Sequence, residues 1–102
     1  MDDPIRIYVL VGIPEEFINN FDVPCSSLGW FPFFGEARNS VLDNYNNIGK
    51  DGYFKWIVIE EIESGFPSNV AYRSWYEWGG DQYYEIDPPN ILKMIKSYAM
   101  GL

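Results

Sequence analysis

The sequence contains no histidine and only one cysteine, Cys25. Without histidine, the chain has no Ser–His or Cys–His catalytic pair and no imidazole ligand for a metal ion. A single cysteine cannot close a disulfide within the chain, and no basic residue lies close to Cys25 in the sequence to lower the pKa of its thiol. These absences exclude several classes of nucleophilic and metal-dependent enzyme, and they predict that Cys25 is a loop thiol or a small core residue.

Basic side chains are also scarce. Seven Lys and Arg residues stand against fifteen Asp and Glu residues, which gives a formal net charge of −8. Such a charge repels a phosphate backbone, so direct binding of nucleic acid is disfavoured. The same charge attracts a basic protein face, although net charge also serves simply to keep a small aromatic-rich domain in solution.

Long apolar runs are missing as well. No segment approaches the roughly 20 consecutive apolar residues that span a bilayer as a helix. The first residues, Met1-Asp2-Asp3-Pro4, are acidic where a secretory signal peptide needs positive charge. We therefore expect a cytoplasmic protein with no membrane association.

What the chain does contain is a strongly hydrophobic segment at its middle. Of its 102 residues, 47% are hydrophobic and 19% are aromatic, which predicts one folded domain over residues 1–102. The most hydrophobic and most β-branched run is 53–62. Because this run is apolar at both alternating sets of positions, it predicts a central strand that is covered on both faces.

The other predicted elements are arranged around this strand. Alternating residues predict strands over 5–11, 70–78 and 81–86, and Gly79-Gly80 predicts a two-residue hairpin turn between the last two. Helical spacing predicts a short turn at 14–21, a helix at 36–48 and a last helix after Asp87 with Ile91, Ile95 and Tyr98 on its apolar face. Residues 13–35 form an irregular aromatic insert. The order predicts an α+β fold: a mixed, mainly antiparallel sheet of about four strands, with the first two parallel and two helices packed on it.

Several carboxylates are expected near one another in the sheet, namely Glu60, Glu61, Glu63, Glu85 and Asp87. Converging carboxylates can serve acid–base catalysis or hold a hard cation. Adjacent residues of a strand point to opposite faces, so Glu60 and Glu61 cannot both join one cluster. A charged strand end that discourages edge-to-edge aggregation is the simpler interpretation.

Aromatic side chains gather on the predicted hairpin, at Tyr72, Trp75, Tyr76, Trp78, Tyr83 and Tyr84, with Arg73 among them. Such residues stabilise strands through cross-strand pairs, and they are also over-represented at binding hot spots. Their rings stack on nucleotide bases too, with Arg6 or Arg73 able to meet a phosphate. A second run, Trp30-Phe31-Pro32-Phe33-Phe34, is either a lid over the core or an exposed patch that needs a partner.

Four patterns suggest a family setting: Trp30-x-Pro32-x-Phe34-x-Glu36-Ala37, Val41-x-x-Asn44, Tyr53-x-Lys55-x-x-Val58-Ile59-Glu60-Glu61-Ile62-x-x-Gly65 and Trp75-Tyr76-x-Trp78. Together they resemble a group of small uncharacterised proteins of bacteria and their phages. That group has no established activity, so the resemblance implies a bacterial or phage setting and no particular chemistry. The stretch from Pro14 to Leu28 lies outside it.

The absences, the negative charge and the aromatic residues favour a small acidic, non-enzymatic binding protein that occupies a partner protein's surface, as inhibitor, immunity and counter-defence proteins do. We predict no catalytic residue, no metal site and no cofactor. The predicted binding residues are Trp30, Phe31, Phe33, Arg73, Trp75, Tyr76, Glu77, Trp78, Asp81 and Tyr83. Sequestration of a small nucleotide-like ligand is the alternative, an enzyme that uses Glu60 or Glu61 is the third, and a symmetric dimer through the aromatic hairpin stays open.

Overall fold

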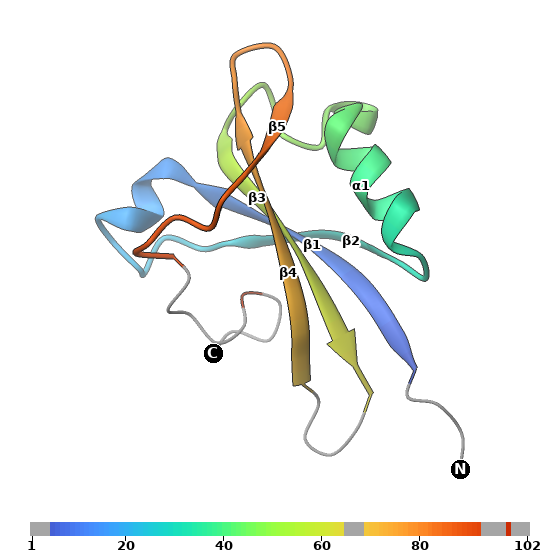
Figure 1. The fold of residues 1–102 in the computed structure, drawn as a ribbon. Coiled ribbons are helices and arrows are strands. Elements are labelled where there is room, and N and C mark those ends of the chain that lie inside the picture. The colour runs from blue at the N-terminus through green and yellow to red at the C-terminus, as the bar shows by residue number, and fades with distance from the viewer. Residues whose placement is uncertain (1–4, 65–68, 93–97, 99–102) are drawn as a thin grey trace.

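The computed structural model describes residues 5–64, 69–92 and 98. They form one five-stranded sheet in the order β2-β1-β3-β4-β5, in which every neighbouring pair of strands is antiparallel (Figure 1). The strands are β1 (Arg6–Pro14), β2 (Ser26–Phe31), β3 (Phe54–Glu63), β4 (Asn69–Trp78) and β5 (Tyr83–Ile86). The helix α1 (Phe34–Leu42) and two short 3-10 turns, η1 (Glu15–Ile18) and η2 (Tyr45–Asn47), complete the described elements.

Strand β3 lies at the centre, between β1 and β4, and its residues alternate between two hydrophobic cores. The helix-side core, which packs against α1, contains Leu10, Ala37, Val41, Ile57, Ile59, Tyr76 and Tyr83. The far-side core, on the opposite face, contains Val9, Val11, Ile13, Phe17, Trp56, Val58, Trp75, Leu92 and Tyr98. The predicted central strand is therefore confirmed, because burial on both faces requires apolar residues at both alternating sets of positions.

The predicted parallel pairing of the first two strands is wrong, and its cause is an unpredicted strand inside the aromatic insert. Strand β1 pairs with β3 antiparallel, with Ile7 opposite Ile62. Strand β2 runs back along β1, and α1 then returns the chain to the end where β3 begins (Figure 1). This additional reversal changes the direction of β3 and raises the strand number from about four to five.

A β-bulge explains why β2 has no clear alternation in the sequence. Leu10 lies opposite Gly29, whereas Val11 lies opposite Ser27, so Leu28 is the extra residue of β2. One inserted residue shifts every later side chain to the other face, which breaks the two-residue period on which strand prediction depends.

The helix α1 is shorter than the predicted helix at 36–48. It ends at Leu42 because Asn44, at a φ of 46°, adopts a left-handed conformation that a right-handed helix cannot contain. Its buried residues are Ala37 and Val41, whereas Tyr45, which the predicted helix included, lies beyond α1 and is 63% exposed.

The end of the chain also differs from the prediction. The β4–β5 connection has four residues, 79–82, because Trp78 lies opposite Tyr83. Most of the predicted last helix falls outside the described residues, so one helix is described where two were predicted. Within 87–92, the Leu92 amide donates to the Pro89 carbonyl in a turn, and Leu92 packs into the far-side core.

Candidate binding surface

Three of the predicted binding residues are core residues. Trp75 is 2% exposed in the far-side core, whereas Tyr76 and Tyr83 are 0% exposed in the helix-side core. The Tyr83 hydroxyl donates to the Phe54 carbonyl oxygen at 2.6 Å. Burial raises the pKa of both Tyr76 and Tyr83. These rings stabilise the sheet and have almost no surface to offer a partner.

The aromatic run from Trp30 to Phe34 divides between the core and the surface. Phe31 packs against the helix-side core, and the Phe34 ring meets the Tyr8 ring edge-on at 5.8 Å. Trp30 and Phe33 are instead 63% and 65% exposed. The two interpretations of this run, a core lid and an exposed patch, therefore each describe part of it.

Arg73 is held in an ion pair. Its Nε donates to Glu60 Oε2 at 2.8 Å, with the Glu60 side chain 0% exposed and the Arg73 side chain 15% exposed. The same oxygen accepts the Tyr98 backbone amide at 3.0 Å, and the Arg73 guanidinium lies 5.3 Å from the centre of the Tyr98 ring. These contacts fix Arg73 as a structural residue of the far side and give no support to its use as a phosphate anchor.

The other predicted carboxylates do not converge. Three of them have separate partners: Glu61 accepts from the Tyr8 hydroxyl at 2.8 Å, Glu63 pairs with Arg6 at 3.3 Å, and Glu85 pairs with Arg38 at 3.4 Å, whereas the fourth, Asp87, is exposed. Within residues 5–64, 69–92 and 98, no group of three or more Asp, Glu or Cys side chains can hold a metal ion. This arrangement does not support an enzyme built on Glu60 or Glu61.

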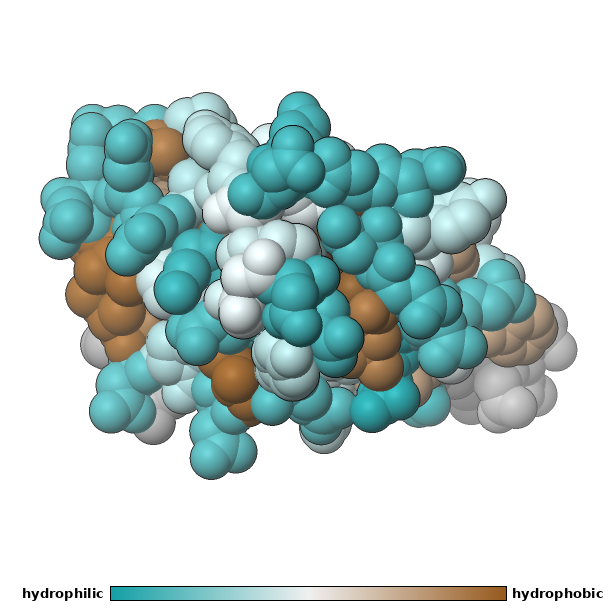
Figure 2. All heavy atoms as spheres, turned by 90° about the horizontal axis from the view of Figure 1, so that it is seen from above, coloured by the Kyte–Doolittle hydropathy of each residue, from teal (hydrophilic) through white to brown (hydrophobic). Residues whose placement is uncertain are grey.

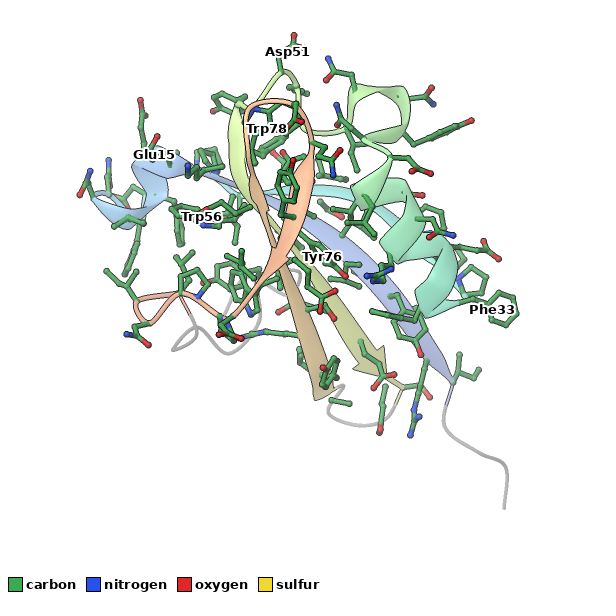
Figure 3. The ribbon with its side chains drawn as sticks, turned by 45° about the horizontal axis from the view of Figure 1, so that its top comes forward. Glu15, Phe33, Asp51, Trp56, Tyr76 and Trp78 are labelled. Carbon is green, nitrogen blue, oxygen red and sulfur yellow. The ribbon has the colours of Figure 1, made fainter. Side chains whose placement is uncertain are left out.

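The last three predicted residues lie at the end of the sheet where β3 begins and β4 ends, which Figure 3 shows around Asp51 and Trp78. Glu77 accepts a hydrogen bond from Trp56 Nε1 at 3.1 Å, and the Trp78 ring meets the Tyr83 ring edge-on at 5.0 Å. Asp81 accepts from the Tyr84 hydroxyl at 3.2 Å. We define this surface, residues 43–53 and 77–84, as the loop end.

The first segment of the loop end has an unusual backbone. Its left-handed residues other than glycine are Asn44, Asn46, Asn47, Lys50 and Asp51, with φ between 46° and 58°. This conformation costs an L-residue roughly 1–2 kcal/mol, less for asparagine. Asparagine oxygens brace it: Asn44 Oδ1 accepts the Gly49 amide at 3.0 Å, and Asn47 Oδ1 accepts the Asp51 amide at 3.1 Å.

Glycine lets this segment lie directly on the β4–β5 hairpin. At Gly52, whose φ is 87°, a Cβ atom would lie 2.5 Å from Trp78 Nε1. A Cβ at Gly49 would overlap the Tyr83 hydroxyl in the same way. The two segments of the loop end therefore pack against each other at van der Waals distance.

Tyrosine and acidic side chains cover the loop end. The exposed tyrosines are Tyr45 at 63%, Tyr53 at 58% and Tyr84 at 47%. The charged residues of the two segments are Asp43, Asp51, Glu77 and Asp81 against Lys50. Figure 2, which views the molecule from this end, shows mostly hydrophilic surface with the hydrophobic residues in separate patches. The hydrogen bond to Asp81 also raises the pKa of Tyr84.

Sequence reasoning missed much of this surface. Tyr45 lies within the predicted helix at 36–48 and Tyr53 within the predicted strand at 53–62, and neither of them nor Asp51 is among the predicted binding residues. The signal was the run Asn44 to Gly52, in which Asn, Asp and Gly mark a turn. An aromatic residue beside such a turn has no strand partner to cover it, so it stays exposed.

Cys25 is expected to react slowly in the folded protein. Its side chain is half-buried against the far-side core, and burial raises the pKa of its thiol to about 11 from 9.0. At pH 8 this leaves roughly 100-fold less thiolate, the reactive form. A chromogenic disulfide reagent should therefore react about 100-fold more slowly with the native protein than with the protein in urea. Equal rates in the two conditions would contradict the burial of this side chain.

Comparison of the chain with models of known families, with curated proteins and with solved structures found no match. In the part of the chain that the structure describes, no helix has the length and apolar character needed to cross a membrane.

Proposed function

We propose that this protein is a non-enzymatic binding protein whose loop end docks on a basic surface of a partner protein, in the manner of inhibitor, immunity and counter-defence proteins. The observation that supports this proposal is the combination of four acids, one lysine and three exposed tyrosines at the loop end, whose first segment has a braced backbone with left-handed residues. Backbone strain of this kind gathers at sites of function, where the surrounding structure maintains it.

The chemistry of these side chains suits arginine and lysine in the partner. Carboxylates such as Asp51 and Asp81 accept charge-assisted hydrogen bonds from a guanidinium, and a tyrosine face attracts the same cation. Tyrosine also offers a large contact area, and its side chain loses little conformational entropy when it is fixed in a complex. Because the loop is already fixed in one conformation, little further ordering is needed when a partner binds.

The loop end favours this function over nucleotide sequestration. Its charged residues sum to −3, from four acids and one lysine, and this charge repels a phosphate. The arginine nearest the hairpin aromatics in sequence, Arg73, is paired with Glu60 at 2.8 Å. A basic protein surface is attracted by this negative charge, and it can bind the loop end while Arg73 stays paired with Glu60.

A titration of the ¹⁵N-labelled protein with a nine-residue oligo-arginine peptide tests the proposal. At low ionic strength, the largest amide shift changes are expected at 43–53 and 77–84, and added salt should weaken the binding. The variant Asp51→Asn/Asp81→Asn removes two loop-end charges and keeps side-chain size. We expect it to raise the dissociation constant about 10-fold.

The matched control is Glu36→Gln/Asp87→Asn, which removes the same charge from two exposed sites outside the loop end. It should change the dissociation constant less than about 3-fold. If both variants lose affinity equally, or if the shift changes spread over the whole acidic surface, net charge alone explains the binding and the proposal fails. Capture of a protein from cell lysate counts in its favour only if the loop-end variant loses that protein and the control retains it.

A further inference from the structure

The edge strand β2 lies inside the longest stretch of the chain that carries no charge. Residues 23–35 contain no Asp, Glu, Lys or Arg, in a protein with a net charge of −8. Among the described residues, strand β2 forms one edge of the sheet and pairs with β1 alone. Its outer side therefore presents backbone donors and acceptors with no charged side chain beside them in the sequence.

The opposite edge is protected in the usual ways. Strand β5 has only four residues, includes the exposed Glu85, and is flanked by the exposed Asp81 and Asp87. Short length and charge both discourage pairing with another strand. Strand β2 has six residues and contains neither a charge nor a proline. The two edges of one sheet thus differ in length and in charge, two of the features that limit strand addition.

Exposed aromatic rings accompany the unprotected edge. Trp30 lies opposite Val9 on the far side of the sheet, is 63% exposed, and is followed by Phe33 at 65%. The bulge at Leu28 interrupts the first half of β2, so the regular part of the edge is Gly29 to Phe31. A strand that added to this part would cover the Trp30 ring.

We infer that β2 is a homodimer interface, in which the β2 edges of two copies pair antiparallel about a two-fold axis and extend the sheet across both chains. The distribution of charge favours a second copy as the occupant. Two chains of net charge −8 repel each other, so a stable contact between them requires a surface to which neither brings charge. A basic partner, in contrast, gains no electrostatic attraction from residues 23–35. This inference is independent of the function proposed for the loop end.

Sedimentation equilibrium of the full chain tests the inference. The mass should rise with concentration from 11.9 kDa for one chain toward twice that value. Added salt should strengthen the dimer, because it screens the repulsion between the chains while the contact itself is uncharged. A chain that stays monomeric at every concentration, or a dimer that salt dissociates, would overturn the inference.

Matched variants locate the interface. Trp30→Lys places a charge at the edge of each copy and should raise the dimer dissociation constant at least about 10-fold. Tyr45→Lys makes the same change at another side chain that is 63% exposed, but in the loop end, and should leave the dimer intact. The reverse pattern would assign the dimer to the loop end and overturn the proposal.

Hydrogen exchange of the unmodified protein gives a readout that needs no variant. Those amides of Gly29 to Phe31 that point away from β1 should exchange more slowly as the protein concentration rises, whereas those of β5 should not change. Slowing confined to β5 would exclude β2 as the paired edge.

Discussion

Replacement of Arg73 by methionine is expected to lower the free energy of unfolding by about 3–5 kcal/mol. Arg73 Nε lies 2.8 Å from Glu60 Oε2, and the Glu60 side chain is 0% exposed. Methionine fills much of the space of the arginine stem but carries no charge. The Glu60 carboxylate therefore stays out of water and loses this cationic partner. Urea denaturation followed by tryptophan fluorescence measures the change.

Two comparisons isolate the role of burial. Arg38→Met removes the partner of Glu85 from a pair whose side chains are 42% and 57% exposed, and it should cost no more than about 1 kcal/mol. Glu60→Gln combined with Arg73→Met removes both charges and keeps an oxygen that can accept the Tyr98 amide, so it should recover much of the loss. If Arg73→Met costs no more than Arg38→Met, the buried pair is not the stabilising contact described here.

Substitution of Gly12 by alanine is expected to destabilise the protein by about 1–3 kcal/mol through overpacking. A Cβ atom at Gly12 would lie 2.6 Å from Phe54 Cγ and within 2.9 Å of both Cδ atoms. Phe54 is 1% exposed, so its ring has no open space into which to move. For a domain of this size, each 1 kcal/mol should lower the melting temperature by roughly 4–8 °C, which calorimetry can measure.

Gly35→Ala is the matched control, since it adds the same methyl group within α1. A Cβ at Gly35 has no heavy atom within 4 Å outside its own neighbourhood, and alanine favours a helix over glycine by about 0.5–1 kcal/mol. The control should therefore leave the melting temperature unchanged or raise it. A loss at Gly35 equal to that at Gly12 would show that the Phe54 contact is not responsible.

The part of the fold that could be predicted is the part in which the pattern of hydrophobic residues indicates which faces are buried. Strand β3 has apolar residues at both alternating sets of positions, which only a strand covered on both faces requires. Strand β2 has no regular hydrophobic pattern, because the bulge at Leu28 breaks the alternation of its side chains between the two faces. The direction of β3 relative to β1 depends on whether β2 exists, so one missed edge strand was enough to reverse a pairing.

The site was less predictable than the fold for a related reason. In β4 both faces are covered, so the neighbours Trp75 and Tyr76 are both buried, although their sequence suits an exposed binding face equally well. The loop end was missed because residue types do not reveal its backbone. Asparagine, aspartate and glycine mark a turn there, but lysine is uncommon at positive φ, and nothing in the sequence indicates that Lys50 adopts it.

The left-handed backbone of the loop also has a consequence for protein engineering, because the residues that favour stability there differ from those that favour the proposed binding. Glycine adopts this backbone without steric cost, whereas Lys50 bears roughly 1–2 kcal/mol and Asp51 a smaller cost. A library of variants sorted for thermal endurance alone would drift toward glycine at these two positions and lose their charges. A library sorted for the proposed binding of a basic partner would instead retain Asp51. Selection for thermal stability and selection for the proposed binding would therefore favour different residues in this loop.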